Sequence, residues 1–99
     1  MKKRNKKPIS PGQILLNQFL KPFGVNQSKL ARDIDVPRSR IAEIITGKRS
    51  ITADTALRLS AYFNTTAQFW LNMQTSYDLS VAMQEEWPQI ALRIRPLVA

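Results

Sequence analysis

The sequence predicts an all-α protein of five helices, because apolar residues recur at three- and four-residue intervals through most of its 99 residues. The repeats are interrupted at residues that commonly begin or end helices, among them Pro37, Gly47 and Asn64. With 43% apolar residues, the chain has enough material for one compact core. We therefore expect one helical domain over residues 11–86, preceded by a flexible basic arm (1–10) and followed by a tail (87–99).

Positive charge is concentrated in the first half of the chain. Residues 1–49 carry a net charge of +9 and residues 50–99 carry −1. This polarity predicts a polyanionic partner, for which nucleic acid is the first candidate. The chain has no cysteine and no histidine, so we expect no catalytic residue, no metal site and no cofactor. No apolar stretch approaches the roughly 20 residues that span a bilayer, and we expect a cytoplasmic protein without a membrane partner.

The first predicted helix begins at Gly12, where Leu15 and Phe19 lie four residues apart on one side. Pro22 and Gly24 are expected to end it, because proline disrupts the helical hydrogen bonds and glycine accepts a left-handed backbone.

Two short helices are predicted next, around a break at Asp35-Val36-Pro37. Asn26 is a good N-cap for the first of them, and Pro37 suits the start of the second. The second buries three isoleucines and stops at Gly47.

A fourth helix is expected after Thr52, closing at Asn64, and a fifth from about Thr66 into the Met83 region, where Thr65 and Gln68 have the spacing of a capping box. The fifth helix is apolar around much of its circumference. It either sits deep in the core or offers a second face, and in so small a chain we favour the second face. Beyond Trp87 an alternating pattern predicts a short extended segment. The predicted dimer interface comprises Trp70, Leu71, Ile90, Leu92 and Ile94.

The two short helices have the composition of a helix-turn-helix, in which the second helix enters the major groove of DNA. Base contacts are predicted for Arg38, Ser39 and Glu43. Arg40 is a candidate for either base or phosphate. Phosphate contacts are predicted for Gln27, Thr46, Lys48 and Arg49. Glu43 has two open interpretations: it accepts from a cytosine amino group, or it pairs with Arg40 or another neighbour and orients a guanidinium.

Specific motifs support this interpretation. "Q-x-x-L-A", the x-V-x-x-S-x-I turn and "G-K-R" resemble the phage-repressor-like (XRE or Cro/CI) helix-turn-helix family. The segments "PGQIL", "VPRSRIAEIITGKRSITADTALRLSAYF" and "FWLNMQTSYDL" more closely resemble HigA-type antitoxins, also named virulence-associated protein I. This resemblance covers about Pro11 to Leu79. Asp35 departs from the wider family, which usually has glycine at that position because the turn needs a positive φ. The resemblance therefore implies a positive φ for Asp35, which Asp tolerates better than most residues.

The resemblance implies an antitoxin that binds a HigB-like toxin, a RelE-like endoribonuclease acting on messenger RNA, and that represses their shared operon. The expected partners are a palindromic double-stranded operator, the toxin and a second copy of the chain. Two alternatives remain: a free-standing phage-type repressor without a toxin, and a small basic protein bound to RNA or the ribosome. The stacking aromatics typical of RNA readers are absent from the basic half.

Overall fold

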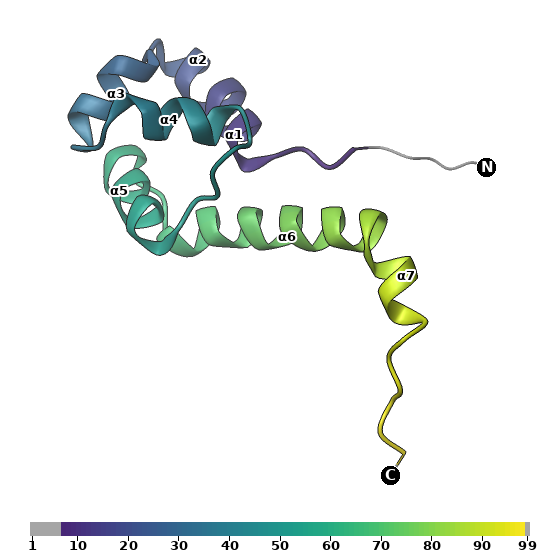
Figure 1. Ribbon diagram of the computed structural model, residues 1–99. Helices are drawn as coiled ribbons and strands as arrows, with labels where there is room; N and C mark the ends of the chain where they lie inside the picture. Colours follow the sequence, from purple (N-terminus) through teal and green to yellow (C-terminus); the bar gives the residue numbers. More distant parts are fainter. Residues whose placement is uncertain (1–6, 99) are drawn as a thin grey trace.

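The computed structural model describes residues 7–98, and within that range every regular element is a helix, as the sequence predicts (Figure 1). The elements are α1 (Pro11–Ile14), η1 (Leu15–Leu20), α2 (Lys21–Phe23), α3 (Gln27–Asp33), α4 (Arg38–Ile45), α5 (Ala53–Phe63), α6 (Ala67–Glu85) and α7 (Trp87–Ala91). The expected basic arm falls mostly on residues 1–6, which lie outside the described range. Residues 7–10 have no regular structure and lead into α1.

The first three elements form one continuous helix, and the prediction that Pro22 ends it is wrong. The helix passes through Pro22 and ends at Gly24, which has a φ of 65°. In an ordinary α-helix, a proline loses the hydrogen bond to the residue four positions earlier and clashes with that carbonyl. Here η1 is a π-helix, and the Lys21 N–H already donates five residues back, to the Leu16 carbonyl. The wider register accommodates the proline.

Four helices end in the same way, with one residue in the left-handed region. The residues are Gly24, Asp35, Gly47 and Asn64, with φ values of 65°, 60°, 83° and 59°. In each case the next residue donates its N–H to the carbonyl five positions earlier, at N···O distances of 2.8 to 3.1 Å. The predictions for Asp35, Gly47 and Asn64 are confirmed. Asp and Asn tolerate this conformation because their short polar side chains hydrogen-bond locally.

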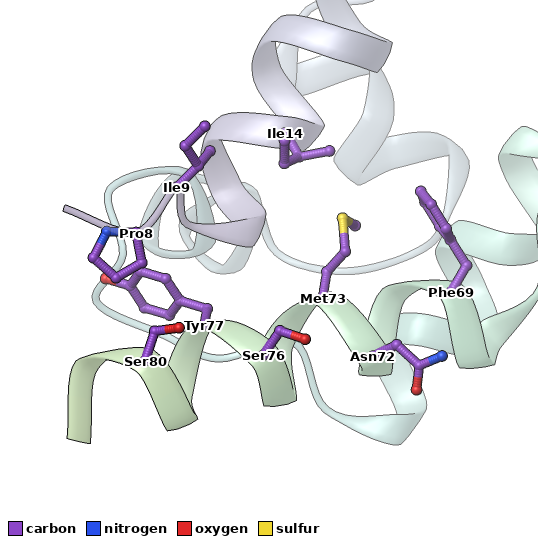
Figure 2. A pocket seen from close by; sticks show the side chains of 9 residues that line it. All are labelled: Pro8, Ile9, Ile14, Phe69, Asn72, Met73, Ser76, Tyr77 and Ser80. Carbon is purple, nitrogen blue, oxygen red and sulfur yellow. The ribbon is translucent and has the colours of Figure 1, made fainter. Parts of the chain in front are cut away.

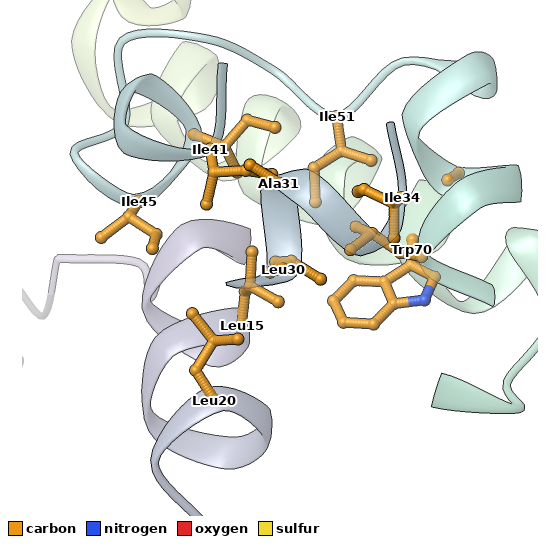
Figure 3. Close-up of a cluster of buried hydrophobic side chains, with 12 residues drawn as sticks. Leu15, Leu20, Leu30, Ala31, Ile34, Ile41, Ile45, Ile51 and Trp70 are labelled. Carbon is orange, nitrogen blue, oxygen red and sulfur yellow. The ribbon is translucent and has the colours of Figure 1, made fainter. Parts of the chain in front are cut away.

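The core is a single cluster contributed by all five longer helices and the loop before α5 (Figure 3). Its buried members are Leu15, Leu20, Leu30, Ala31, Ile34, Ile41, Ile44, Ile45, Ile51, Ala56, Leu59 and Trp70. Trp70 is 0% exposed, and its indole N–H donates to the Thr65 hydroxyl oxygen at 2.8 Å. The expectation that Trp70 lies on an exposed second face is therefore wrong. Its large ring fills the space that the short helices leave between them.

The long α6 changes character along its length. Its first half contributes Trp70 and Gln74 to the interior, and its second half has no buried residue. Thr66, one position after the expected capping residue, caps the helix by accepting the Phe69 N–H at 3.0 Å. After Glu86 the chain turns into α7, as Figure 1 shows at the yellow end.

The predicted extended segment beyond Trp87 is wrong in its first part, because Ile90 belongs to α7. Pro88 sits in the first turn of this helix, where its missing N–H is harmless. Leu92 lies in the turn that follows, and Ile94 belongs to an irregular segment with no strand partner within residues 7–98. Three apolar residues two positions apart do not by themselves distinguish a strand from the end of a short helix and the turn after it.

Candidate nucleic-acid interface

Helix α4 has one buried side and one polar, exposed side. Three isoleucines, Ile41, Ile44 and Ile45, hold it against the core. At about 100° per residue, Ser39, Ala42, Glu43 and Thr46 fall on the opposite side of the helix. Arg38 is exposed at the helix start. We call these five residues the α4 stripe. Sequence reasoning missed Ala42, which is partly exposed and supplies a small methyl group between the polar members.

The turn between α3 and α4 is tightly hydrogen-bonded. The Asp35 N–H donates to the Arg32 carbonyl at 3.3 Å, and the Val36 N–H donates to the Ala31 carbonyl at 3.0 Å. Pro37 then takes the N-cap position of α4 in an extended conformation. The break predicted from the sequence therefore joins two short helices that share one core, which is the geometry of a helix-turn-helix.

Two arginines of this region form ion pairs. Arg40 Nη1 lies 3.3 Å from Asp54 Oδ2 on α5, so its guanidinium is held beside α5 and away from the α4 stripe. Arg49 Nε lies 2.8 Å from Glu43 Oε1. Of the two interpretations of Glu43, the structure shows the pairing, with Arg49 as the partner. Both pairs are partly exposed to solvent, so a phosphate or a base can compete for them.

Three of the four predicted phosphate contacts lie outside the α4 stripe, and the fourth, Thr46, belongs to it. Gln27 occupies the first turn of α3 and is partly exposed, whereas Lys48 and Arg49 are exposed just beyond Gly47. The Thr46 hydroxyl donates to the Glu43 carbonyl at 3.2 Å, so its proton is used at the end of α4. Arg38 and Ser39 are the predicted base-reading residues that stay exposed at the helix start. The structure thus gathers these residues around one helix.

Comparison with known proteins supports the geometry. Residues 16–70 match the helix-turn-helix family. Virulence-associated protein I of Dichelobacter nodosus is 52% identical over 84 residues, which cover 84% of this chain and 78% of that protein. The chain belongs to this helix-turn-helix family. A structure of the Pseudomonas aeruginosa antitoxin HigA with the higBA promoter has a TM-score of 0.87 at 42% identity, covering 92% of this chain and 99% of that one. Antitoxin GraA in complex with its operator has a TM-score of 0.88 at 38% identity, over 100% of both chains.

The helix-turn-helix is supported from outside by two residues that sequence reasoning did not assign to the site. Arg58 Nη1 donates to the carbonyls of Ile34 and Asp35, at 2.8 and 3.0 Å. Its Nε donates to Asp54 at 3.0 Å. The four-residue spacing of Asp54 and Arg58 on one helix predicts their ion pair. The contact with the turn joins residues 24 positions apart and leaves no local signal in the sequence.

Asp33, at the end of α3, is held by two donors. Lys29 Nζ lies 2.7 Å and the Tyr62 hydroxyl 2.9 Å from Asp33 Oδ2. The hydrogen bonds from Lys29 and Tyr62 lower the pKa of Asp33. The same contact with Asp33 raises the pKa of Lys29. Burial, followed by the hydrogen bond to Asp33, raises the pKa of Tyr62. The carboxylate therefore stays charged and ties α3 to α5.

The far end of α4 is fixed by close packing. A Cβ at Gly12 would overlap the carbonyl oxygen of Ile44, so only glycine lets the first helix approach α4 this closely. The buried Gln74 of α6 accepts the Ile51 N–H at 2.8 Å and holds the loop after α4. Both ends of the recognition helix are therefore positioned by other helices.

A groove of about 540 Å³ lies between the chain just before α1 and the middle of α6 (Figure 2). Ile9 and Ile14 face it from one side, and Met73 and Tyr77 face it from the other. None of the residues lining it carries a charge. The groove offers no positive charge to a phosphate, and its lining shares no residue with the α4 stripe.

The residues predicted for a dimer interface are not gathered in one place. Trp70 is buried and Leu71 half-buried near the start of α6, whereas Ile90 lies on α7 and Leu92 and Ile94 beyond it. The intervening length of α6 separates the two groups by about 20 Å at 1.5 Å per residue.

Among residues 7–98, none of the helices is long and apolar enough to cross a membrane. The same range contains no cluster of three acidic residues arranged to hold a metal ion.

Proposed function

We propose that this protein is an antitoxin that represses its own operon by binding operator DNA through α4, and that it neutralises a HigB-like endoribonuclease toxin. The observation that carries the proposal is the α4 stripe, a polar helix face flanked by Gln27 on one side and by Lys48 and Arg49 on the other. Such a face meets base edges while its neighbours meet phosphates. The relatives solved with promoter and operator DNA support the same use of this fold.

Within the stripe, Arg38, Ser39 and Glu43 are the proposed base contacts. Arg38 and Ser39 stand at the helix start, where a recognition helix first meets base edges. For Glu43 to accept from a cytosine, Arg49 must leave it and move to a phosphate. Arg40 is a weaker candidate, because Asp54 already holds its guanidinium.

The protein is proposed to bind its operator as a homodimer through the second half of α6, α7 and the following residues. Leu79, Met83, Trp87, Leu92 and Ile94 are between 44% and 83% exposed, which is unusual for large apolar side chains of a single small domain. A two-fold arrangement would present two α4 helices to successive major grooves about 34 Å apart.

We further propose that the protein acts in the bacterial cytoplasm and associates with the nucleoid when bound to DNA.

The DNA-binding claim is tested by fluorescence anisotropy with the duplex upstream of the protein's own gene, against a shuffled duplex and a structured RNA of equal length. Preferential binding of the native duplex is expected. Equal affinity for all three would contradict the proposal and favour a general polyanion binder.

The antitoxin claim is tested by co-expression with the product of the neighbouring open reading frame. We expect that product to arrest growth alone, to be harmless with this protein, and to co-purify with it. If no neighbouring product is toxic and none co-purifies, a free-standing repressor becomes the better description.

A further inference from the structure

Helix α5 carries three polar residues at four-residue spacing, Asp54, Arg58 and Tyr62, and each contacts a different part of the helix-turn-helix. Asp54 binds Arg40 of α4, Arg58 binds the carbonyls of the turn, and Tyr62 binds Asp33 of α3. Residues four apart lie along one side of a helix. We call these three residues the α5 ladder. The ladder connects one side of α5 to both helices of the motif and to the turn between them.

Arg58 is the central member of the α5 ladder. The carbonyls at a helix C-terminus lack partners within their own helix, and those of Ile34 and Asp35 lie at the C-terminus of α3. Arg58 Nη1 donates to both, at 2.8 and 3.0 Å. Its positive charge also suits the negative end of the helix dipole. The planar guanidinium therefore fixes the turn in one orientation.

The network extends from Arg58 to the recognition helix. Asp54 Oδ2 accepts from Arg58 Nε at 3.0 Å and from Arg40 Nη1 at 3.3 Å. One carboxylate oxygen thus joins the residue that holds the turn to a residue in the first turn of α4. The base of the ladder is firm, because Thr55, Ala56 and Leu59 of α5 are buried.

The α5 ladder is poorly placed to stabilise the fold as a whole. The side chains of Asp54, Arg58 and Arg40 are 57%, 36% and 31% exposed, and exposed ion pairs contribute little to folding. The buried apolar cluster already holds α3 and α4 together. The α5 ladder instead fixes the orientation of the helix-turn-helix, because hydrogen bonds are directional and apolar contacts are not.

We infer that Arg58 is a positioning residue for sequence readout: by holding the turn and, through Asp54, the start of α4, it sets the angle at which the α4 stripe meets the bases. The inference rests on the proposed function. Loss of Arg58 should therefore reduce discrimination between operator and random DNA, because base contacts need accurate placement. Phosphate contacts tolerate small rotations and should be preserved.

The test compares Arg58→Met with the wild-type protein in anisotropy titrations on the operator and on a shuffled duplex, over a range of salt concentrations. Methionine keeps an unbranched apolar stem and removes every donor. We expect operator affinity to fall about tenfold, the size of one lost base contact, and random-DNA affinity to change by less than about twofold. The salt slope should stay constant, because no phosphate contact is lost.

Arg58→Lys and Lys21→Met serve as controls. Lysine keeps the charge without the planar fork that reaches two carbonyls and Asp54, so it should restore only part of the discrimination. Lys21 is exposed on α2, outside both the proposed DNA contacts and the proposed dimer interface, and its replacement removes the same charge. It should leave the ratio of operator to random affinity unchanged.

Equal losses on both duplexes, with a salt slope reduced by about one, would make Arg58 a phosphate contact and overturn the inference. An unchanged affinity ratio would overturn it as well. If Arg58→Met fails to fold, Asp54→Asn breaks the link to Arg40 and should lower the ratio in the same direction. A wild-type protein without operator preference would instead overturn the proposed function.

Discussion

Around α4, most of the side chains that reach solvent are polar or charged, whereas along the second half of α6 and in α7 several of them are apolar. Ser39, Glu43 and Lys48 represent the first region, and Leu79, Met83 and Trp87 represent the second. Polar groups suit a wet interface with DNA, which is rich in charge and ordered water. Exposed apolar groups suit an interface that excludes water. The proposed nucleic-acid interface and the proposed dimer interface therefore lie in different parts of the molecule.

The two tryptophans offer the sharpest contrast between these regions. Trp70 is 0% exposed and Trp87 is 44% exposed. Trp70→Ala should lower the free energy of unfolding by about 3–5 kcal/mol, because it empties the centre of the core. Trp87→Ala should cost much less in protein dilute enough to be monomeric. Urea denaturation followed by circular dichroism measures both, and equal costs would contradict the assignment.

Gly12 tests how closely the first region is packed. Gly12→Ala should destabilise the protein by about 1–3 kcal/mol, because the added methyl group meets the Ile44 carbonyl at the end of α4. Gln18→Ala, at an exposed position of the same continuous helix, is the matched control and should be close to neutral. Thermal denaturation of the two variants gives the comparison. A stabilised Gly12→Ala protein would show that α1 does not approach α4 this closely.

Part of this architecture was predictable because its signals are local. Pro37 and Gly47 mark the two ends of α4 through their own backbone preferences, whereas the positive φ of Asp35 was predictable only from the resemblance to the wider family. The path of the chain through Pro22 was not predictable, because it depends on a register change in the preceding turns.

The residues of the candidate site also differ in whether their placement can be predicted from the local sequence. The exposure of Arg38 and Ser39 follows from helical periodicity, whereas the burial of Trp70 depends on how several short helices leave a central space. The partner of Arg40 lies 14 residues away on α5, and the Ile34 carbonyl that accepts from Arg58 lies 24 residues away at the end of α3. The charge of Arg40 and its place on the helix therefore predict a contact with DNA, whereas its ion pair with Asp54 can be seen only in the structure.

The apolar second region is tested through association. Met83→Glu should weaken self-association about tenfold or more, because it buries a charge in the proposed interface. Gln68→Glu places the same charge at an exposed position near the start of α6 and should have little effect. Light scattering over a dilution series measures both. A wild-type mass that stays monomeric at every concentration would remove the proposed dimer.

The smallest expected effect concerns the link between α3 and α5. The lowered pKa of Asp33 means that its contribution is fully present above its ordinary value of 3.8 and is lost as pH falls through the lower folded value. The raised pKa of Tyr62 gives a contribution present below its ordinary value of 10.0 and lost as pH rises through the higher folded value. Tyr62→Phe should flatten the alkaline limb of the stability profile. An unchanged limb would show that the hydroxyl contributes nothing there.

The most direct test of the central claim, that the base contacts proposed on α4 read sequence while the proposed phosphate contacts only hold the DNA backbone, compares Arg38→Ala with Lys48→Ala on operator and random duplexes. Arg38→Ala should cost on the order of 1–3 kcal/mol on the operator and much less on random DNA. Lys48→Ala should weaken both alike and reduce the salt slope by about one. The opposite result, in which Lys48→Ala changes the preferred sequence and Arg38→Ala lowers affinity uniformly, would contradict the account.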